Sequence, residues 1–142
     1  MASTEPAVRA LLDEWSESIR QKDVDRLMAV YSPDIVYFDV VPPLRLVGAD
    51  AVRRNFVRWF DTWSSPIGVE IRELSLIAGA DLAAAHMLWR TSGLLKVGRE
   101  VGYWIRASVT CRRSGQGWRL THEHVSLPVE LPSAKAAMDL KP

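Results

Sequence analysis

Residues 14–39 read EWSESIRQKDVDRLMAVYSPDIVYFD, and the change of periodicity inside this stretch decides the fold. Its first part continues an i, i+3, i+4, i+7 pattern of apolar side chains that begins at Val8 and is typical of a buried helical face. A second short helix, with Asp23 as a good N-cap, is expected to end before Pro33, because proline disfavours helical geometry in the preceding residue. The run IVYFDV at 35–40 then predicts a strand. We therefore expect two helices to lead directly into the first strand of a sheet.

The rest of the chain is expected to add one helix and four strands. Asp50 is a candidate N-cap for the third helix, whose apolar stripe includes Val52, Phe56 and Trp59. The strands are predicted at 69–78, 82–92, 100–112 and 118–127. Helices segregated beside hairpin-connected strands predict an α+β fold. Helices across one face of a bent sheet would leave a cavity between the two layers.

Bulk properties limit the classes of function. A chain of 142 residues is long enough for one domain with a real core, which we place at 1–128, followed by an extension at 129–142 that need not be rigid. With 18 basic and 17 acidic residues the net charge is +1, so electrostatics favours neither a nucleic acid nor an anionic membrane as partner. No apolar run reaches membrane-spanning length. Cys111 is the one cysteine, so no internal disulfide can form, and a reducing cytoplasm is the expected location.

Three stretches together resemble the SnoaL-like and ketosteroid-isomerase-like branch of the nuclear transport factor two-like superfamily. They are residues 14–39, LVGADAVRRNF at 46–56 and GWRLTHEHVSLP at 117–128. The resemblance implies a cone-shaped α+β fold, in which a strongly curved, mostly antiparallel β-sheet carries the N-terminal helices over its concave face. It also implies a homodimer. The likeness rests on the order and spacing of the stretches and not on one short motif.

The resemblance implies a role for Asp39. In the ketosteroid isomerases a catalytic aspartate base ends the first strand, just before a loop that runs to a glycine and the third helix. Asp39 stands at that place, and Gly48 closes the loop. The resemblance implies that Asp39 faces the cavity, and alternation along the strand puts Tyr37 on the same face. In an apolar cavity a carboxylate becomes a better base near neutral pH. Alternatively, Asp39 pairs with Arg106 or caps the following loop.

Two other parts of that active site differ here. Trp15 stands where the family has an oxyanion-binding tyrosine on its first helix, and an indole offers one N–H but no phenol. The family's second donor is a protonated aspartate on a late strand, and the corresponding stretch YWIRASVTCRR has no carboxylate. That stretch presents Trp104, Arg106, Ser108 and Thr110 on one face. A buried arginine needs a partner, so Arg106 either pairs with a protein carboxylate or binds an acidic ligand.

Residues 121–126, THEHVS, contain two histidines in a predicted strand. His122 and His124 share a face, and Glu123 points the other way. A metal site needs at least three converging ligands, and the resemblance implies that His86 lies on the far side of the sheet, so we predict no metal site. The histidines then form either a polar wall of the cavity or a dimer contact on the outer face. We favour the cavity wall, where His124 could relay a proton.

These observations predict a cofactor-independent isomerase- or cyclase-type enzyme for a small, hydrophobic, carbonyl-bearing ligand. Asp39 would move a proton alpha to the carbonyl, and Arg106, His124 or Trp15 would stabilise the enolate oxygen. Beside the catalytic Asp39 and His124, the expected substrate-binding residues are Trp15, Tyr37, Trp59, Trp63, Trp89, Trp104, Arg106, Ser108 and His122. The core explains Trp15, Trp59, Trp63 and Trp89 as well as a pocket does. Alternatives are a non-catalytic ligand-binding or oligomerisation module of the same fold, and hydrolysis or epoxide opening by Asp39 with Arg106.

Overall fold

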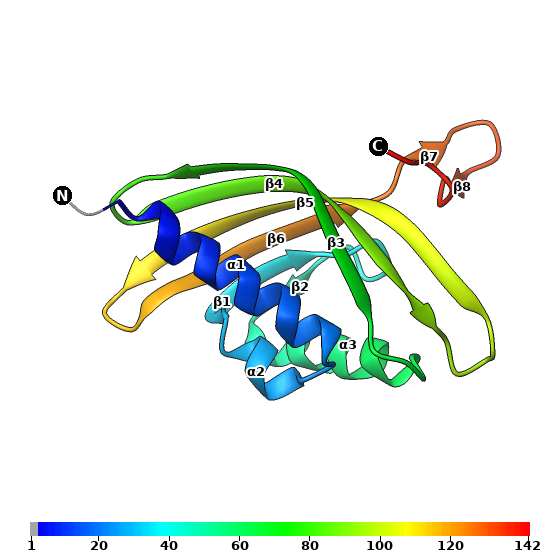
Figure 1. Cartoon of the computed structure of the whole chain (residues 1–142), viewed down its shortest axis with the longest axis horizontal. Helices are drawn as coiled ribbons and strands as arrows, with labels where there is room; N and C mark the ends of the chain where they lie inside the picture. The colour runs from blue at the N-terminus through cyan, green and yellow to red at the C-terminus, as the bar shows by residue number, and fades with distance from the viewer. Residues whose placement is uncertain (1–2) are drawn as a thin grey trace.

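The computed structural model describes residues 3–142, in which three helices pack on one side of a large curved sheet and a small hairpin follows it (Figure 1). The helices are α1 (Glu5–Arg20), α2 (Val24–Met28) and α3 (Ala49–Asp61). The strands of the sheet are β1 (Tyr31–Phe38), β2 (Leu46–Val47), β3 (Gly68–Ala78), β4 (Leu82–Leu94), β5 (Glu100–Ser114) and β6 (Gly117–Ser126). The hairpin consists of β7 (Val129–Glu130) and β8 (Lys135–Ala136). The predicted α+β fold with a curved, mostly antiparallel sheet is confirmed.

The strands follow the spatial order β2-β1-β6-β5-β4-β3. Strands β3 to β6 form consecutive antiparallel hairpins, whereas β1 pairs in parallel with β6. The parallel pairing brings the ends of β1 and β6 to the same place, with Phe38 opposite His124 and Tyr37 opposite Glu123. As a result, the loop after β1 and the last residues of β6 lie side by side, although about 85 residues separate them in the chain.

The core lies between the helices and the concave face of the sheet. One face of α1 is buried there, and α3 contributes the apolar side chains of Val52, Phe56 and Phe60. Positions along the central strands β4 and β5 alternate between buried and exposed, so each strand has one face in the core and one face toward solvent. Removal of apolar surface from water on the concave side is the main favourable contribution to folding.

Two element boundaries differ from the sequence-based expectation. Asp50 is not the N-cap of α3, because the helix begins one residue earlier with Gly48 at the cap. Gly48 has a φ of 88°, a conformation that glycine adopts without steric cost, and its N–H donates to the carbonyl of Ile35 at 2.8 Å. Tyr31 lies before Pro33 and so falls within the range expected for the second helix, but it opens β1, where it pairs with Leu120. Tertiary pairing with β6 therefore overrides the local helical pattern.

Strand β6 contains a β-bulge that changes which of its side chains are buried. Thr110 of β5 pairs with His122, and the next residue of β5, Cys111, pairs with Leu120, so Thr121 is the extra residue. A bulge shifts the alternation of side chains by one position. Both Leu120 and Glu123 are therefore buried on the concave side, although they lie three positions apart and regular alternation would put them on opposite faces.

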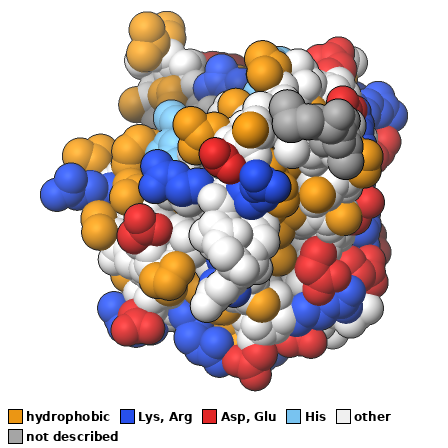
Figure 2. Space-filling view, turned by 90° about the vertical axis from the view of Figure 1, so that its left-hand side faces the viewer, with side chains coloured by type: hydrophobic (Ala, Val, Ile, Leu, Met, Phe, Trp, Pro, Cys, Tyr) orange, Lys and Arg blue, Asp and Glu red, His pale blue; other side chains and the backbone are white. Residues whose placement is uncertain are grey.

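Surface charge follows the balanced composition. The face seen in Figure 2 intersperses Lys and Arg with Asp and Glu and shows no continuous basic patch. Between residues 3 and 142, no helix is long and apolar enough to cross a membrane.

The core described above predicts a contrast between two isoleucines of the sheet. Ile35 in β1 is 0% exposed and Ile77 in β3 is 75% exposed. Ile35→Ala should lower the free energy of unfolding by about 2 to 5 kcal/mol, because it removes apolar contacts and leaves a cavity. Ile77→Ala is the control and should change it by less than about 0.5 kcal/mol. Urea denaturation followed by tryptophan fluorescence measures both, and equal effects would contradict this description of the core.

Candidate functional site

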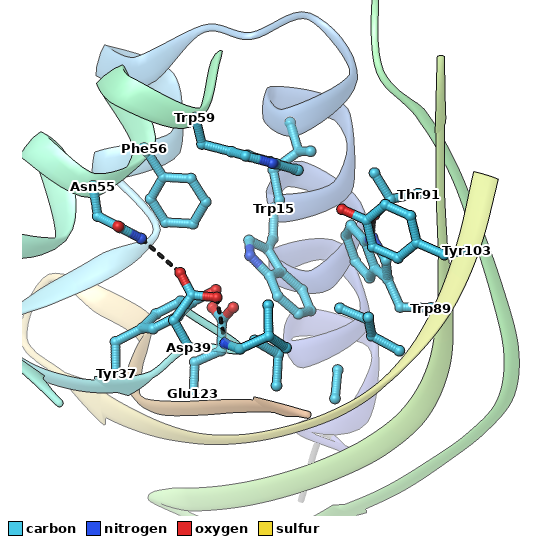
Figure 3. Close-up of a pocket in the computed structure, with 15 residues that line it drawn as sticks. Trp15, Tyr37, Asp39, Asn55, Phe56, Trp59, Trp89, Thr91, Tyr103 and Glu123 are labelled. Atoms are coloured by element: carbon cyan, nitrogen blue, oxygen red, sulfur yellow. Dashed lines mark hydrogen bonds between the residues drawn. The ribbon is translucent and has the colours of Figure 1, made fainter. Parts of the chain in front are cut away.

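A cavity of about 80 Å³ lies between α1, α3 and the concave face of the sheet (Figure 3). Five residues predicted from the sequence line it: Trp15, Tyr37, Asp39, Trp59 and Trp89. Other parts of the wall come from α3 and β5, namely Asn55, Phe56, Tyr103, Ile105 and Ala107. The wall is mainly apolar and aromatic with a few polar groups, as in sites for small organic ligands.

The carboxyl of Glu123 lies at the wall of this cavity and is only 2% exposed. The Tyr31 hydroxyl donates a hydrogen bond to Glu123 Oε1 at 2.6 Å. Trp15 Nε1–H in turn donates to the Tyr31 oxygen at 3.1 Å. The chain of donors therefore runs from α1 through β1 to β6, and it places the Glu123 carboxyl against the cavity.

Burial raises the pKa of Glu123 from 4.5 to about 8, because the charged form loses its hydration. The hydroxyls of Tyr31 and Tyr37 lower it, and the charge of nearby Asp39 raises it further. Burial, reinforced by the Glu123 charge, also raises the pKa values of Tyr31 and Tyr37 well above their ordinary range. At neutral pH the inner end of the cavity therefore holds a carboxylic acid at Glu123 and a protonated phenol at Tyr37, and the protonated Tyr31 hydroxyl supports Glu123 from behind.

Sequence reasoning missed Glu123 because it assumed unbroken alternation along β6. The interpretation grouped His122 and His124 with Leu120, which is indeed buried, and so assigned them to the cavity. The bulge at Thr121 breaks that alternation. A usable signal was present all the same: Glu123 shares a face with apolar Val125, and Val125 is buried in the same wall.

Asp39 lies half-buried just after the end of β1, as predicted, and its carboxylate is held by two donors. Asn55 Nδ2 of α3 donates to Oδ2 at 2.8 Å, and the Val40 N–H donates to Oδ1 at 2.6 Å (Figure 3). The expectation that Asp39 caps the following loop is therefore correct in part. These bonds orient the carboxylate beside the cavity without a cationic partner from Arg106.

The prediction that His122 and His124 form a wall of the cavity is wrong. Both lie on the convex face of the sheet, where Phe38 packs edge-on against them with ring centroids 4.8 and 5.3 Å away. His122 Nδ1 is 2.8 Å from the carbonyl oxygen of Val36 and His124 is exposed. His86 is exposed on the same convex side, next to Ser108, as expected. The bulge at Thr121 is the physical reason for the exchange of faces.

The cavity assignment of Trp104, Arg106 and Ser108 is also wrong. Alternation along β5 buries Ala107 and Val109, so these three side chains point to the convex face. Arg106 is exposed, and its Nε–H donates to Ser126 Oγ at 3.0 Å. Arg106 therefore needs no buried carboxylate and cannot bind a ligand inside the cavity.

Two further residues belong to the core and not to the cavity wall. Trp63 is 2% exposed and packs edge-on against Trp59 at 5.9 Å between ring centroids, outside the cavity lining. Cys111 is buried, and burial raises the pKa of its thiol to about 12, so it behaves as a small hydrophobic residue of the core. Among residues 3–142, no three His, Cys, Asp or Glu side chains gather in a way that could hold a metal ion.

The fold and this cavity define a class of α+β proteins in which a cavity lies between a curved sheet and its helices. A family model described as a SnoaL-like domain matches residues 8–130, and the chain belongs to this family. A solved NTF2-like protein of unknown function from Pseudomonas putida is 32% identical, with both chains covered over 100% of their length and a TM-score of 0.89.

More distant solved structures share the fold alone. A ketosteroid isomerase-like protein from Erwinia carotovora is 20% identical, with a TM-score of 0.76 over 89% of this chain and 97% of that chain. A nuclear transport factor 2-like superfamily protein from Salmonella enterica is 17% identical, with a TM-score of 0.78 over 90% of this chain and 95% of that chain. A search of curated proteins found no match.

The raised pKa of Glu123 predicts how stability depends on pH. Between about pH 4.5 and pH 8 the folded protein keeps a proton on Glu123 that the unfolded chain has lost. The folded state thus binds more protons, so the free energy of unfolding falls as the pH rises through this range. Below it both states are protonated, and the contribution stays constant.

Glu123→Gln removes this titration and keeps the oxygen that accepts from Tyr31. The free energy of unfolding of the variant minus that of wild type should rise by about 3 to 5 kcal/mol from pH 5 to pH 9, because wild type loses stability over this range. Each unit of pKa shift contributes about 1.4 kcal/mol. Chemical denaturation at a series of pH values measures the difference. The exposed Glu130→Gln serves as control, and a stability difference between Glu123→Gln and wild type that does not change with pH would show that Glu123 is not held protonated.

Proposed function

We propose that this protein is a cofactor-independent acid–base enzyme that moves a proton alpha to the carbonyl of a small, uncharged molecule. One observation carries the proposal: a buried, protonated carboxyl at Glu123 and a hydrogen-bonded carboxylate at Asp39 share one apolar cavity. When the environments of two acidic groups differ in this way, the protonated group can act as the hydrogen-bond donor and the carboxylate as the general base.

The proposed reaction begins with the carbonyl oxygen of the ligand at the inner end of the cavity. There Glu123 donates a hydrogen bond through its own proton, and the neighbouring Tyr37 hydroxyl supports the Glu123 carboxyl. These groups stabilise the negative charge that develops on the oxygen as the enolate forms. Asp39 accepts the proton from the alpha carbon and returns it to a carbon of the same molecule. No electrons are gained or lost overall, and the product is an isomer.

Trp15 supports this reaction in a different way from the one expected. Its N–H is engaged by the Tyr31 oxygen and is not directed at a ligand. It orients the Tyr31 hydroxyl toward Glu123 and so acts as a positioning residue. The apolar wall around these groups excludes water, which strengthens the hydrogen bonds to the developing charge.

Cavity size limits the ligand. The cavity of about 80 Å³ is small compared with sites for drug-sized ligands, which measure roughly 300 to 1,000 Å³. A single ring with one or two substituents fits this space, and a fused polycyclic skeleton does not. The proposed substrate is therefore much smaller than a steroid.

The alternative function is ligand binding without turnover in the same cavity. It requires the same walls and the same neutral Glu123, but no base at Asp39. Binding and proton transfer can be measured on one ligand, so the alternative predicts that a cyclic ketone binds and that its alpha hydrogens do not exchange.

The central prediction concerns Asp39. Wild-type protein in ²H₂O should exchange the alpha hydrogens of a cyclic ketone, which NMR follows directly. Asp39→Asn should reduce the rate by about a thousandfold or more, because an amide cannot accept the proton from the alpha carbon. In one rotamer the amide oxygen still accepts the hydrogen bond from Asn55 Nδ2, so the local structure is kept. Asp34→Asn, at an exposed position of β1, is the matched control and should leave the rate unchanged.

The same assay tests the role of Glu123 through its pH dependence. The exchange rate should fall as the pH rises through about 8, where Glu123 loses the proton that it donates. Glu123→Gln should be slower at pH 7 and should no longer show this fall. If Asp39→Asn exchanges as fast as wild type, the proposed reaction is wrong and the binding alternative replaces it.

We also propose that two copies of the chain form a homodimer through the convex face of the sheet. Half-buried Trp104, beneath the guanidinium of Arg72, and half-buried Phe38 give this face apolar surface. Light scattering at micromolar concentration should give twice the chain mass of 16.0 kDa. Trp104→Ala should shift the mass toward one chain, and a monomeric wild type would refute the dimer.

A further inference from the structure

A second polar end of the cavity lies opposite the carboxyl groups. It is formed by Tyr103 of β5 and Thr91 of β4, which are direct cross-strand partners and both line the cavity. Thr91 is 2% exposed, and its Oγ1 accepts a hydrogen bond from Trp89 Nε1 at 3.1 Å. Figure 3 shows the Tyr103 hydroxyl directed into the cavity, across from Asp39. The proposed reaction does not use these groups.

Tyr103 is a neutral hydroxyl group that a ligand can reach. Burial raises its pKa, and the charge of Asp39 raises it further, so the phenol keeps its proton at physiological pH. The Thr91 hydroxyl and the Trp59 indole lie near its oxygen. A phenol in these surroundings both donates and accepts hydrogen bonds and therefore fits an alcohol or a carbonyl oxygen.

An apolar stretch separates the two polar ends. Glu123 pairs with Val109 across β6 and β5, and on the same face of β5 the side chains of Ala107 and Ile105 lie between that position and Tyr103. From the helical side, the rings of Phe56 and Trp59 border the same space (Figure 3). The cavity thus offers oxygen-binding groups at both ends and flat apolar walls in the middle.

The lining also selects against negative charge. Of the described residues that line the cavity, two carry carboxyl groups and none is a lysine, arginine or histidine. A carboxylate or phosphate bound here would lose its hydration without gaining a cationic partner and would face Asp39. Arg106 lies on the convex face, so it cannot bind an acidic ligand in this cavity.

We propose that the cavity binds an uncharged, single-ring hydroxy-ketone or diketone, with a carbonyl at Glu123 and Asp39 and a second oxygen at Tyr103. The assignment of the reacting carbonyl to the Glu123 end rests on the proposed function. The requirement for a second oxygen rests on Tyr103 and Thr91 alone. Tyr103 is then the residue that determines specificity, because leaving its hydroxyl without a partner inside the cavity costs binding energy.

The test uses three ketones that share one ring: 4-hydroxycyclohexanone, its near-isostere 4-methylcyclohexanone, and the anion 4-oxocyclohexanecarboxylate. Dissociation constants are measured by calorimetry at pH 7 for wild type, Tyr103→Phe and Tyr37→Phe. Wild type should bind the hydroxy compound about five to ten times more tightly than the methyl compound. It should bind the carboxylate at least about ten times more weakly than either neutral ketone.

Tyr103→Phe should abolish the preference for the hydroxy compound by weakening its binding and leaving the methyl compound within about twofold. Tyr37→Phe is the matched control, since it removes the same hydroxyl from the opposite end. It should weaken both neutral ketones equally and keep their ratio. Thermal melting of both variants verifies that they fold.

An unchanged ratio in Tyr103→Phe, or tightest binding of the carboxylate, would overturn the inference. Alpha-hydrogen exchange on 4-methylcyclohexanone separates this failure from failure of the proposed function. If exchange depends on Asp39 but Tyr103→Phe leaves the ratio of the two dissociation constants unchanged, only the second oxygen site is refuted. If Tyr103→Phe abolishes the preference for the hydroxy compound but no exchange occurs, the proposed reaction is refuted and the ligand class stands. Absence of binding by all three ketones refutes both.

Discussion

The hydrogen bond from Tyr31 to Glu123 is the interaction on which the rest of the site depends. It joins the first strand to the last, and through Trp15 it also joins both to the first helix. A carboxyl group buried to 2% exposure is costly unless it is hydrogen-bonded and neutral, and this structure meets both conditions. Burial of Glu123 destabilises the folded state, and by raising the pKa of the carboxyl it also keeps the proton that the proposed chemistry requires. Stability and function are therefore opposed at this residue, as is common in active sites.

The bulge at Thr121 and the parallel pairing of β1 with β6 place the two carboxyl groups together. The bulge turns Glu123 toward the helices and leaves His122 and His124 on the convex face. The parallel register sets Tyr37 beside Glu123 and brings the end of β1 to the same level, so Asp39 follows immediately. Without the extra residue in β6, the histidines would occupy the cavity and Glu123 would lie in solvent. One inserted residue thus decides which titratable side chains face the ligand.

Division of the sheet into two faces separates two kinds of surface. The concave face holds two carboxyl groups, neutral hydroxyls and aromatic rings. The convex face of β4, β5 and β6 holds His86, Arg106 and His124. Basic side chains are thereby kept out of the cavity, and the site depends on acids and phenols in a dry environment. Such groups act on uncharged carbonyl compounds more readily than on anions, because none of the described residues in the lining is a cation that could bind negative charge.

The sequence alone determined the order of the elements and the class of the fold. The helical periodicity around Trp15, the strand that ends at Asp39 and the hairpin-connected strands after Pro66 are local patterns that survive in the structure. The resemblance put Asp39 on the cavity side, and alternation within β1 put Tyr37 on the same face, because β1 is regular over those residues. In β4, alternation put Trp89 and His86 on opposite faces, and the resemblance assigned the inner face to Trp89, as the structure has it.

Only the tertiary structure decided the faces of β5 and β6 and therefore the identity of the proton donor. Nothing local in THEHVS marks Thr121 as the bulged residue, because the bulge arises from the register with β5 and the curvature of the sheet. The convex position of Arg106 likewise depends on which face of β5 the helices cover. Periodicity gives the spacing of side chains along a strand. The phase of that spacing relative to the core is set by long-range pairing, and here the phase decides the chemistry.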